Sequence, residues 1–277
     1  NIAQVFQFPV IYTTKSVRGN LAFPLECRNW PKEQIKDRVE YIAALLDLTE
    51  ILDYPARKLS ADQKQLISLG RGLVRDDVSA VLLDEPLTVI DPQMKFTLRR
   101  KLREINRATG ITMILVTHDQ SEAMSFADEV VVMKDGCVQQ SGSPEQLFAR
   151  PNNEFVGYFI GSPPLNLFSV QFRNECLYVP VLDQLLPADA GGSLETIKVG
   201  VRPEHLKVQK SSEEDPQAQV TGIDDLGIEQ VFSMRGRNGE LFKVKSRLNR
   251  DLMCGDSVEV AVAAKDVMIF KEGLLVG

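Results

Sequence analysis

The stretch AVLLDEPLTVIDP, from Ala80 to Pro92, is an apolar run that ends on two adjacent acids, followed by a proline and a third acid at Asp91. The apolar residues predict a buried strand that ends at Asp84 and Glu85. In open α/β sheets, ligands bind beyond the carboxyl ends of the parallel strands, so acids at this point face a ligand crevice instead of the core. Two neighbouring carboxylates can then divide the chemistry: one supports a hydrated Mg²⁺ ion and the other polarises an attacking water.

A second apolar run, ITMILV, is followed by THD and carries His118 to the same edge of the sheet. A lone histidine is more often structural, but a position parallel to Asp84 and Glu85 favours contact with a terminal phosphate. Helix-period segments, among them DRVEYIAALL and MKFTLRRKLREI, alternate with the strand-like runs. This alternation predicts an α/β domain with a parallel sheet, in which LRRKLR forms the solvent face of a helix.

Towards the end of this domain, Asp135-Gly136 suits a tight hairpin, and Ser143 with Gln146 predicts a capping box at the start of a helix. The pattern changes near residue 160. After FIGSPPLN the chain has short alternating strands and turns, such as IKVGV, AQVTGI and EQVFSMRGRNGELFKVKS, in which Asn238-Gly239 suits a hairpin turn. We therefore expect an α/β domain over residues 1–160 and a small all-β barrel or sandwich over residues 161–277.

Composition excludes several classes of protein. No apolar run reaches the roughly 18–20 residues of a membrane span, and the first residues lack a signal-peptide pattern. The formal net charge of -6 argues against broad nucleic-acid binding. The four cysteines are far apart and form no C-x-x-C pair, which predicts neither a disulfide framework nor a zinc site and suits a reducing cytoplasm.

Three segments follow one another in the order and spacing of an ATP-binding cassette (ABC) ATPase, which the chain resembles: LSADQKQLISLGRGLV, VLLDEPLTVID and ILVTHDQSEAMSFAD. In addition, VFQFPVIYTTKSVRGNLAFPL is similar to the glutamine loop of that family. FVGYFIGSPPLN and VGVRPEHL resemble the carbohydrate-importer subfamily, which has a C-terminal oligonucleotide-fold-like (TOBE) regulatory domain.

The resemblance covers nearly the whole chain and implies an ATPase subunit of an importer for sugars, polyols or glycerol-type solutes, with ATP and Mg²⁺ as cofactors. The implied fold is a partial P-loop-type ABC domain over residues 1–160, with a helical subdomain over about 29–75, followed by an OB-like barrel over 161–277.

Residue roles follow from the resemblance by position. Gln7 would sense Mg²⁺ and water, Asp84 would support Mg²⁺, Glu85 would be the general base, His118 would be the switch histidine, and Asp91 would lie in the loop that communicates across a dimer.

The signature segment LSADQ would contact the nucleotide held by the opposite subunit, through Ser60, Ala61, Asp62 and Gln63. Free N–H groups at the start of a helix and the helix dipole favour such an anion.

The same resemblance implies several partners. Two ATPase subunits, identical or different, would share two sites, and a membrane-spanning permease would dock near Phe8 to Leu25 and on the helical segment after Pro31. A plain amphipathic surface is the alternative for that region. A solute-binding protein would act indirectly, no nucleic acid is expected, and the protein would lie in the cytoplasm at the inner face of the cell membrane.

Two departures from the family pattern limit this interpretation. The loop G-x-x-x-x-G-K-[ST], which cradles phosphates, is absent from these residues, so the chain as it stands should not hydrolyse ATP. The simplest account is that the amino-terminal portion precedes Asn1. The alternative is a catalytically silent regulatory subunit.

The second departure is Ala61-Asp62, where the family has two glycines. A carboxylate about 4 Å from a γ-phosphate charge would cost roughly 4 kcal/mol at an effective dielectric near 20. Alternatively, Asp62 suits the first turn of a helix and points away from the nucleotide. One hypothesis is that this chain pairs with a second, different ATPase that has an intact signature.

For the β-rich part, regulation or dimer contact ranks before nucleic-acid binding, because it lacks a basic-aromatic stripe. In VRPEHL, Arg202 and His205 are expected to fix a turn and the domain interface.

Overall fold

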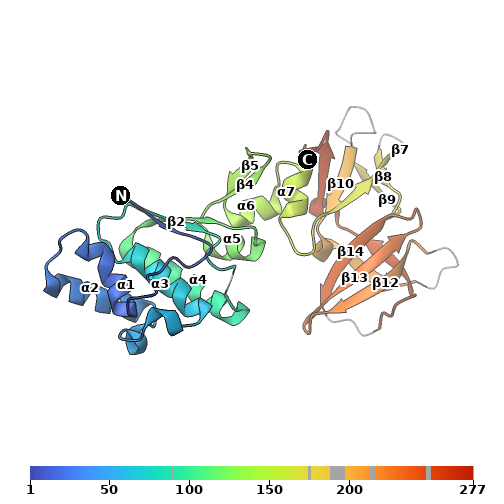
Figure 1. The fold of residues 1–277 in the computed structure, drawn as a ribbon. Helices are drawn as coiled ribbons and strands as arrows, with labels where there is room; N and C mark the ends of the chain where they lie inside the picture. The colour runs from blue at the N-terminus through green and yellow to red at the C-terminus, as the bar shows by residue number, and fades with distance from the viewer. Residues whose placement is uncertain (89, 174–175, 188–196, 212–215, 248–250, 277) are drawn as a thin grey trace. The chain divides into compact units, whose positions relative to one another are not determined.

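The computed structural model describes residues 1–88, 90–173, 176–187, 197–211, 216–247 and 251–276 (Figure 1). The chain divides into two compact units between Ala127 and Asp128. This division lies earlier than residue 160, because the segment that precedes residue 160 packs with the β-rich part, as described below. The domain limits 1–160 and 161–277 remain predictions.

The first unit is built on a parallel sheet of three strands, β1 (Ile2–Val5), β2 (Ala80–Asp84) and β3 (Thr112–Val116). Leu83 of β2 pairs in register with Val5 of β1 and with Leu115 of β3. Parallel neighbours need long crossover connections, and the helices between the strands supply them. The α/β class and both strands expected from the sequence are confirmed.

The crossover from β1 to β2 contains α1 (Val17–Glu26), α2 (Lys32–Leu45) and α3 (Ala61–Leu73), with 3-10 turns at Thr49–Ile51 and Ala56–Lys58. The crossover from β2 to β3 contains α4 (Pro92–Thr109), and α5 (Gln120–Phe126) follows β3. Gly70 of α3 allows the helices to pack closely, because a Cβ there would lie 2.6 Å from Leu21 Cδ2 and 3.0 Å from Leu46 Cδ1. Of the three helices in this packed group, α2 and α3 fall within the expected helical region of residues 29–75, whereas α1 precedes it.

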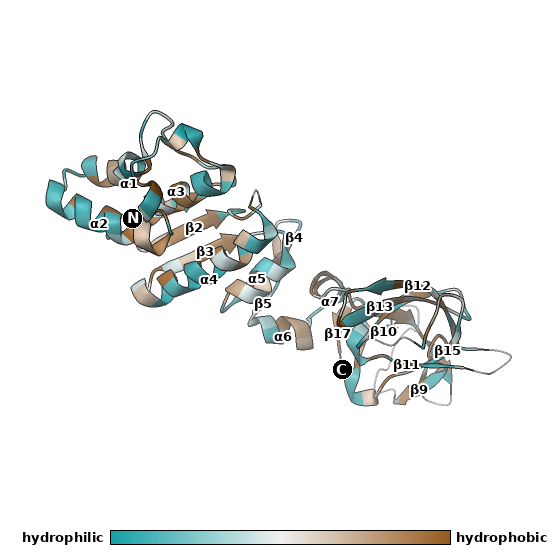
Figure 2. Ribbon diagram, turned by 90° about the horizontal axis from the view of Figure 1, so that it is seen from below, coloured by the Kyte–Doolittle hydropathy of each residue, from teal (hydrophilic) through white to brown (hydrophobic). Residues whose placement is uncertain are grey.

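The two faces of the sheet differ. Val5, Val81 and Leu83 are buried in the core of the first unit. On the opposite face, Ile114 and Val116 are about half exposed. Figure 2 shows β2 coloured as hydrophobic, whereas α2 is largely hydrophilic. Parallel sheets in globular proteins are usually covered on both sides, so the open apolar face is an unusual feature of the described residues.

The second unit begins with a hairpin of β4 (Val130–Lys134) and β5 (Cys137–Gly142), joined by Asp135-Gly136. Both turn residues have positive φ, 50° and 76°, as a tight hairpin turn requires. The helices α6 (Pro144–Ala149) and α7 (Glu154–Phe159) follow, and Ser143 with Gln146 forms the capping box expected from the sequence.

The residues that the structure describes in the β-rich part form three antiparallel sheets. The four-stranded sheet has the order β17-β16-β10-β6, the five-stranded sheet β11-β15-β12-β13-β14, and the three-stranded sheet β7-β8-β9.

The strands of these sheets are β6 (Asn166–Ser169), β7 (Gln171–Arg173), β8 (Cys176–Val179), β9 (Gln184–Pro187), β10 (Ile197–Val201), β11 (Lys207–Lys210), β12 (Ala218–Asp225), β13 (Glu229–Gly236), β14 (Leu241–Arg247), β15 (Ser257–Ala261), β16 (Val267–Lys271) and β17 (Leu274–Leu275). Among the described residues, 3-10 turns at Pro203–His205 and Ala264–Asp266 connect β10 to β11 and β15 to β16. The expected all-β character and the hairpin turn at Asn238-Gly239 are confirmed.

Arg202 fastens the segment before residue 160 to this β-rich part. Its side chain is fully buried and donates to the carbonyl oxygens of Phe148 (2.8 Å), Gly157 (2.9 Å) and Ile160. These carbonyls lie at the ends of α6 and α7, where helices leave acceptors without intrahelical partners. Arg202 therefore has a structural role, as expected, but its contacts lie within the second unit, and a role at a domain interface remains a prediction.

Candidate functional site

Glu85 is placed by the end of β2. The strand finishes at Asp84, which pairs with Val116, and the Glu85 N–H then donates to the Val116 carbonyl at 2.9 Å. Glu85 has φ +43°, a conformation that residues other than glycine adopt rarely and that is often found at functional sites. This turn stops the strand and carries the carboxylate to the carboxyl edge of the sheet.

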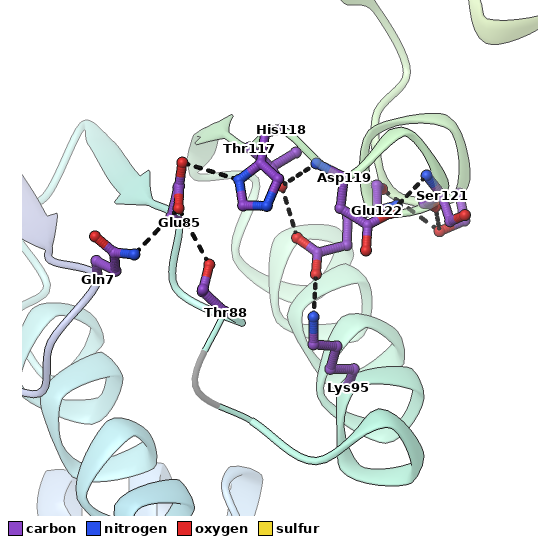
Figure 3. Close-up of polar contacts among 10 residues, drawn as sticks. Gln7, Glu85, Thr88, Lys95, Thr117, His118, Asp119, Ser121 and Glu122 are labelled. Atoms are coloured by element: carbon purple, nitrogen blue, oxygen red, sulfur yellow. Dashed lines mark hydrogen bonds and ion pairs between the residues drawn. The ribbon is translucent and has the colours of Figure 1, made fainter. Parts of the chain in front are cut away.

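Three side chains converge on the Glu85 carboxylate (Figure 3). His118 Nδ1 lies 3.0 Å from Oε1, while Gln7 Nε2 and Thr88 Oγ1 each donate to Oε2 at 3.2 Å. Gln7 follows β1, Thr88 follows β2 and His118 follows β3. The parallel sheet therefore brings together residues that are up to 111 positions apart in the chain, because its three strands end at one edge.

The electrostatics of the cluster are set chiefly by the histidine. The hydrogen bond from His118 holds the pKa of Glu85 below its usual range, and the bond from Thr88 acts in the same direction. The His118 side chain is 71% exposed, against 28% for Glu85. An ionised carboxylate therefore lies behind an imidazole that remains accessible to a ligand.

The residues at this edge fit a magnesium ion. Mg²⁺ is usually bound through one or two carboxylates together with substrate phosphates and water. Asp84 is exposed at the end of β2, and Gln7 uses its amide nitrogen on Glu85, which leaves its amide oxygen as an acceptor. Within the described ranges there is no group of three or more metal-ligating side chains, so a protein-only metal cage is not formed there.

The signature residues lie together at the start of α3. Ser60 is the N-cap: its Oγ accepts the Gln63 N–H at 3.3 Å, and Gln63 Oε1 accepts the Ser60 N–H at 3.1 Å. Asp62 lies in the first turn, where a negative charge is favourable, and Ala61 is exposed. The side-chain hydrogen bonds between Ser60 and Gln63 are internal to the cap and do not join this segment to Glu85.

Asp91 caps another helix. Its Oδ1 accepts the Gln93 N–H at 2.9 Å at the start of α4, with Pro92 as the first helical residue. The structure thus shows a capping function for Asp91.

Sequence reasoning missed Thr88 and a polar cluster behind the site, made of Lys95, Thr117 and Glu122. Thr88 follows Glu85 by three residues, so a tight turn after β2 was a usable signal. Glu122 is only 2% exposed, and it contacts Lys95 and Thr117. The sequence shows Glu122 only as a polar residue early in a helix, so nothing there indicates its burial.

The comparisons with known proteins agree with this geometry. The TOBE domain family matches residues 199–270. The trehalose/maltose import ATP-binding protein MalK of Thermococcus litoralis is 36% identical over 98% of this chain and 76% of its own length. The sn-glycerol-3-phosphate import ATP-binding protein UgpC of Brucella abortus is 34% identical over the same shares of the two chains, 98% and 76%.

A solved structure also resembles the chain. CbiO1 from Clostridium perfringens, described as part of the ABC transporter complex cbiONQ, is 30% identical with a TM-score of 0.50, over 53% of this chain and 58% of that one. The fold and the edge of the sheet define an ABC-type ATPase domain. The chain belongs to the family of ABC importer ATPase subunits that carry a TOBE domain.

Proposed function

We propose that this chain is the ATP-hydrolysing subunit of an importer that takes up a sugar, polyol or glycerol-type solute through membrane partners. The observation that carries the proposal is the convergence of Gln7, Thr88 and His118 on the carboxylate of Glu85 at the carboxyl edge of three parallel strands. Relatives named as import ATP-binding proteins for trehalose, maltose and sn-glycerol-3-phosphate support the solute class.

Each residue has a role that suits its chemistry. Phosphoryl transfer to water depends on positioning and on stabilising charge, with little covalent chemistry for the protein to perform. Glu85 accepts the proton of the attacking water, and Gln7 and Thr88 hold that carboxylate in place. His118, exposed on its outer side, contacts the γ-phosphate.

Asp84 and the amide oxygen of Gln7 would hold Mg²⁺, which would neutralise charge on the phosphates. The lowered pKa of Glu85 makes it a weak base in the absence of ligand. A phosphate anion bound beside the carboxylate opposes its charge and raises its pKa, so the base strengthens when substrate is present.

Hydrolysis also needs a phosphate-holding loop from outside these residues, because the 277 residues contain no G-x-x-x-x-G-K-[ST] segment. The open sheet face with Ile114 and Val116 borders the site and is suited to receive such a segment.

The signature segment, with Ser60, Ala61, Asp62 and Gln63, would contact the nucleotide of an opposite subunit. Asp91 would lie in the loop that communicates between the two sites of the dimer.

The exposed apolar side chains of Phe8, Val10 and Tyr12 support permease docking near Phe8 to Leu25. The protein would then lie at the inner face of the cell membrane. None of the described helices is both long and apolar enough to cross a bilayer.

The domains would be an ABC domain over 1–160 and a TOBE domain over 161–277. The TOBE domain would have a regulatory or dimer-contact function.

A catalytically silent regulatory subunit is the second candidate, and Ala61-Asp62 in the signature favours it. The test uses the chain joined to a phosphate-loop segment taken from one of the import ATP-binding relatives. Glu85→Gln should keep ATP binding and lower the ATPase rate by about 10²-fold or more, in the range of a lost general base. Glu104→Gln, at an exposed acid on α4 whose side chain is 62% exposed, is the matched control and should keep the full rate.

Light scattering of the Glu85→Gln protein with and without ATP and Mg²⁺ adds the oligomeric state. ATP-driven dimers would favour a self-paired ATPase. A monomer that still binds ATP would direct the search to a second ATPase subunit. Failure to bind nucleotide would refute the ATPase proposal and favour the regulator.

A further inference from the structure

A buried carboxylate lies directly behind the candidate site. Glu122, on α5, is 2% exposed, and both of its carboxylate oxygens have partners. Oε1 accepts from Lys95 Nζ at 3.1 Å, and Oε2 accepts from Thr117 Oγ1 at 2.9 Å (Figure 3). Removing a carboxylate from water is costly unless it is paired and hydrogen-bonded, and Glu122 meets both conditions.

Through Oε2, the Glu122 carboxylate holds the turn that carries His118. Thr117 immediately precedes the histidine, and its hydroxyl has two bonds: it donates to Glu122 and accepts the Asp119 N–H at 3.0 Å. Asp119 in turn caps α5 by accepting from Ser121 and Glu122. The backbone on both sides of His118 is therefore fixed through Glu122 and the cap of its helix.

On the other side, the carboxylate reaches the start of α4. Lys95 lies in the first turn of that helix, and its N–H donates to the Asp91 carbonyl at 2.9 Å. The Lys95 side chain is 22% exposed, so most of its stem is enclosed. One buried ion pair thus connects the helix that begins after Asp91 with the turn that presents His118.

We propose that Lys95, Glu122 and Thr117 are positioning residues that hold His118 in the orientation that meets Glu85 and connect that orientation to the start of α4 at Asp91. The inference rests on the proposed function for its role in hydrolysis, but the orientation itself can be measured without nucleotide. A change at either end, such as ligand contact at His118 or a partner at the Asp91 loop, would reach the other end through this ion pair.

The ring ¹⁵N signals of His118 can be assigned without ambiguity, because His118 and His205 are the only histidines of the chain. An ionised carboxylate is only an acceptor, so the bond to Glu85 requires the proton on Nδ1 of His118. The hydrogen bond that a ring nitrogen makes sets the tautomer. Ring ¹⁵N spectra at about pH 8.5, above the usual range of histidine titration, report which nitrogen carries the proton.

In the 277-residue chain without nucleotide, His118 should show the Nδ1-protonated form. Lys95→Met and Glu122→Gln remove the ion pair while keeping side-chain size, and Thr117→Val removes the hydroxyl. In each variant the Nδ1-protonated form of His118 should cease to be the major one, while the His205 signals stay unchanged. Lys95→Arg and Thr117→Ser keep the donors and should restore the pattern.

Folded variants whose His118 signals match the parent would overturn the proposal. Lys95→Met, at a member of the cluster whose side chain is 22% exposed, keeps the test decisive if Glu122→Gln fails to fold. Loss of the His118 pattern in Lys95→Met without recovery in Lys95→Arg would also overturn it, since general loosening of the helix would then explain the change. None of these outcomes depends on ATP hydrolysis, so a failure of the proposed function would leave them interpretable.

Discussion

Arg202→Met tests how the β-rich part holds the ends of α6 and α7. Arg202 is fully buried, stacks over the Phe148 ring with its guanidinium carbon 4.2 Å from the ring centroid, and donates to three backbone carbonyls. Methionine has a similar length and keeps the apolar contact, but it donates nothing. The variant therefore leaves the carbonyls of Phe148, Gly157 and Ile160 without this donor.

The magnitude follows from two opposing terms. Each buried acceptor left without a partner costs roughly 1–3 kcal/mol. Against this, burial lowers the pKa of Arg202 to about 10, so keeping its charge inside costs about 3 kcal/mol at roughly 1.4 kcal/mol per pKa unit, and methionine removes that cost. The expected net loss of stability is about 3 kcal/mol, confined to the second unit.

Urea unfolding of the whole chain provides the assay and an internal control. Far-ultraviolet circular dichroism follows the secondary structure of both units, whereas the single tryptophan, Trp30, lies in the first unit and reports that unit alone by fluorescence, so the transition of the β-rich part is the circular-dichroism change that the Trp30 signal does not share. For a slope of about 2 kcal/mol per molar urea, the midpoint of the β-strand transition should fall by about 1.5 M, with the Trp30 midpoint unchanged.

Two further variants sharpen this result. Arg202→Lys keeps the charge but loses the planar fork, so it should recover only part of the loss. Arg235→Met, at an exposed arginine on β13, should stay within about 0.5 kcal/mol of the parent chain. A β-strand midpoint in Arg202→Met that equals that of Arg235→Met would refute the reasoning.

The remaining predictions concern the first unit. Because the hydrogen bond from His118 lowers the pKa of Glu85, its stabilising contribution is present above the usual glutamate range and is lost as the pH falls through the lowered value. His118→Ala should raise that pKa toward its usual value in side-chain ¹³C spectra, and an unchanged titration would contradict the assignment. Gly70→Ala should lower the free energy of unfolding by about 1–3 kcal/mol through overpacking. In Gly72→Ala the nearest atoms to the new Cβ would lie at 3.5 Å, so this variant should be neutral or gain up to about 1 kcal/mol. Equal Trp30 midpoints for the two variants would disprove the packing argument. Ser60→Ala should cost about 1 kcal/mol through loss of the capping box, and an unaltered Trp30 midpoint would argue against a capping role.

Much of the local structure could be predicted from the sequence, because it depends on neighbouring residues. The apolar run before Asp84 predicted a strand, Ser143 with Gln146 predicted a capping box, and Asp135-Gly136 predicted a hairpin turn. Each rests on backbone preference or on hydrogen bonds within a few residues, which the order of residues states directly. The placement of Glu85 and His118 at one edge also followed, since the ends of parallel strands share an edge.

The exact partners at the site could be decided only by the tertiary structure. Thr88 reaches Glu85 through the left-handed turn at Glu85 itself, and Glu122 becomes a buried anion only because α5 packs on α4 beside Lys95. Arg202 meets its carbonyl acceptors 42 to 54 residues earlier in the chain. Burial and pairing across such separations depend on how helices and sheets pack, and residue spacing alone does not encode them. The sequence by itself determined the elements and the family of this protein. The packing of those elements determined which charges are buried, which are paired and which remain open to a ligand.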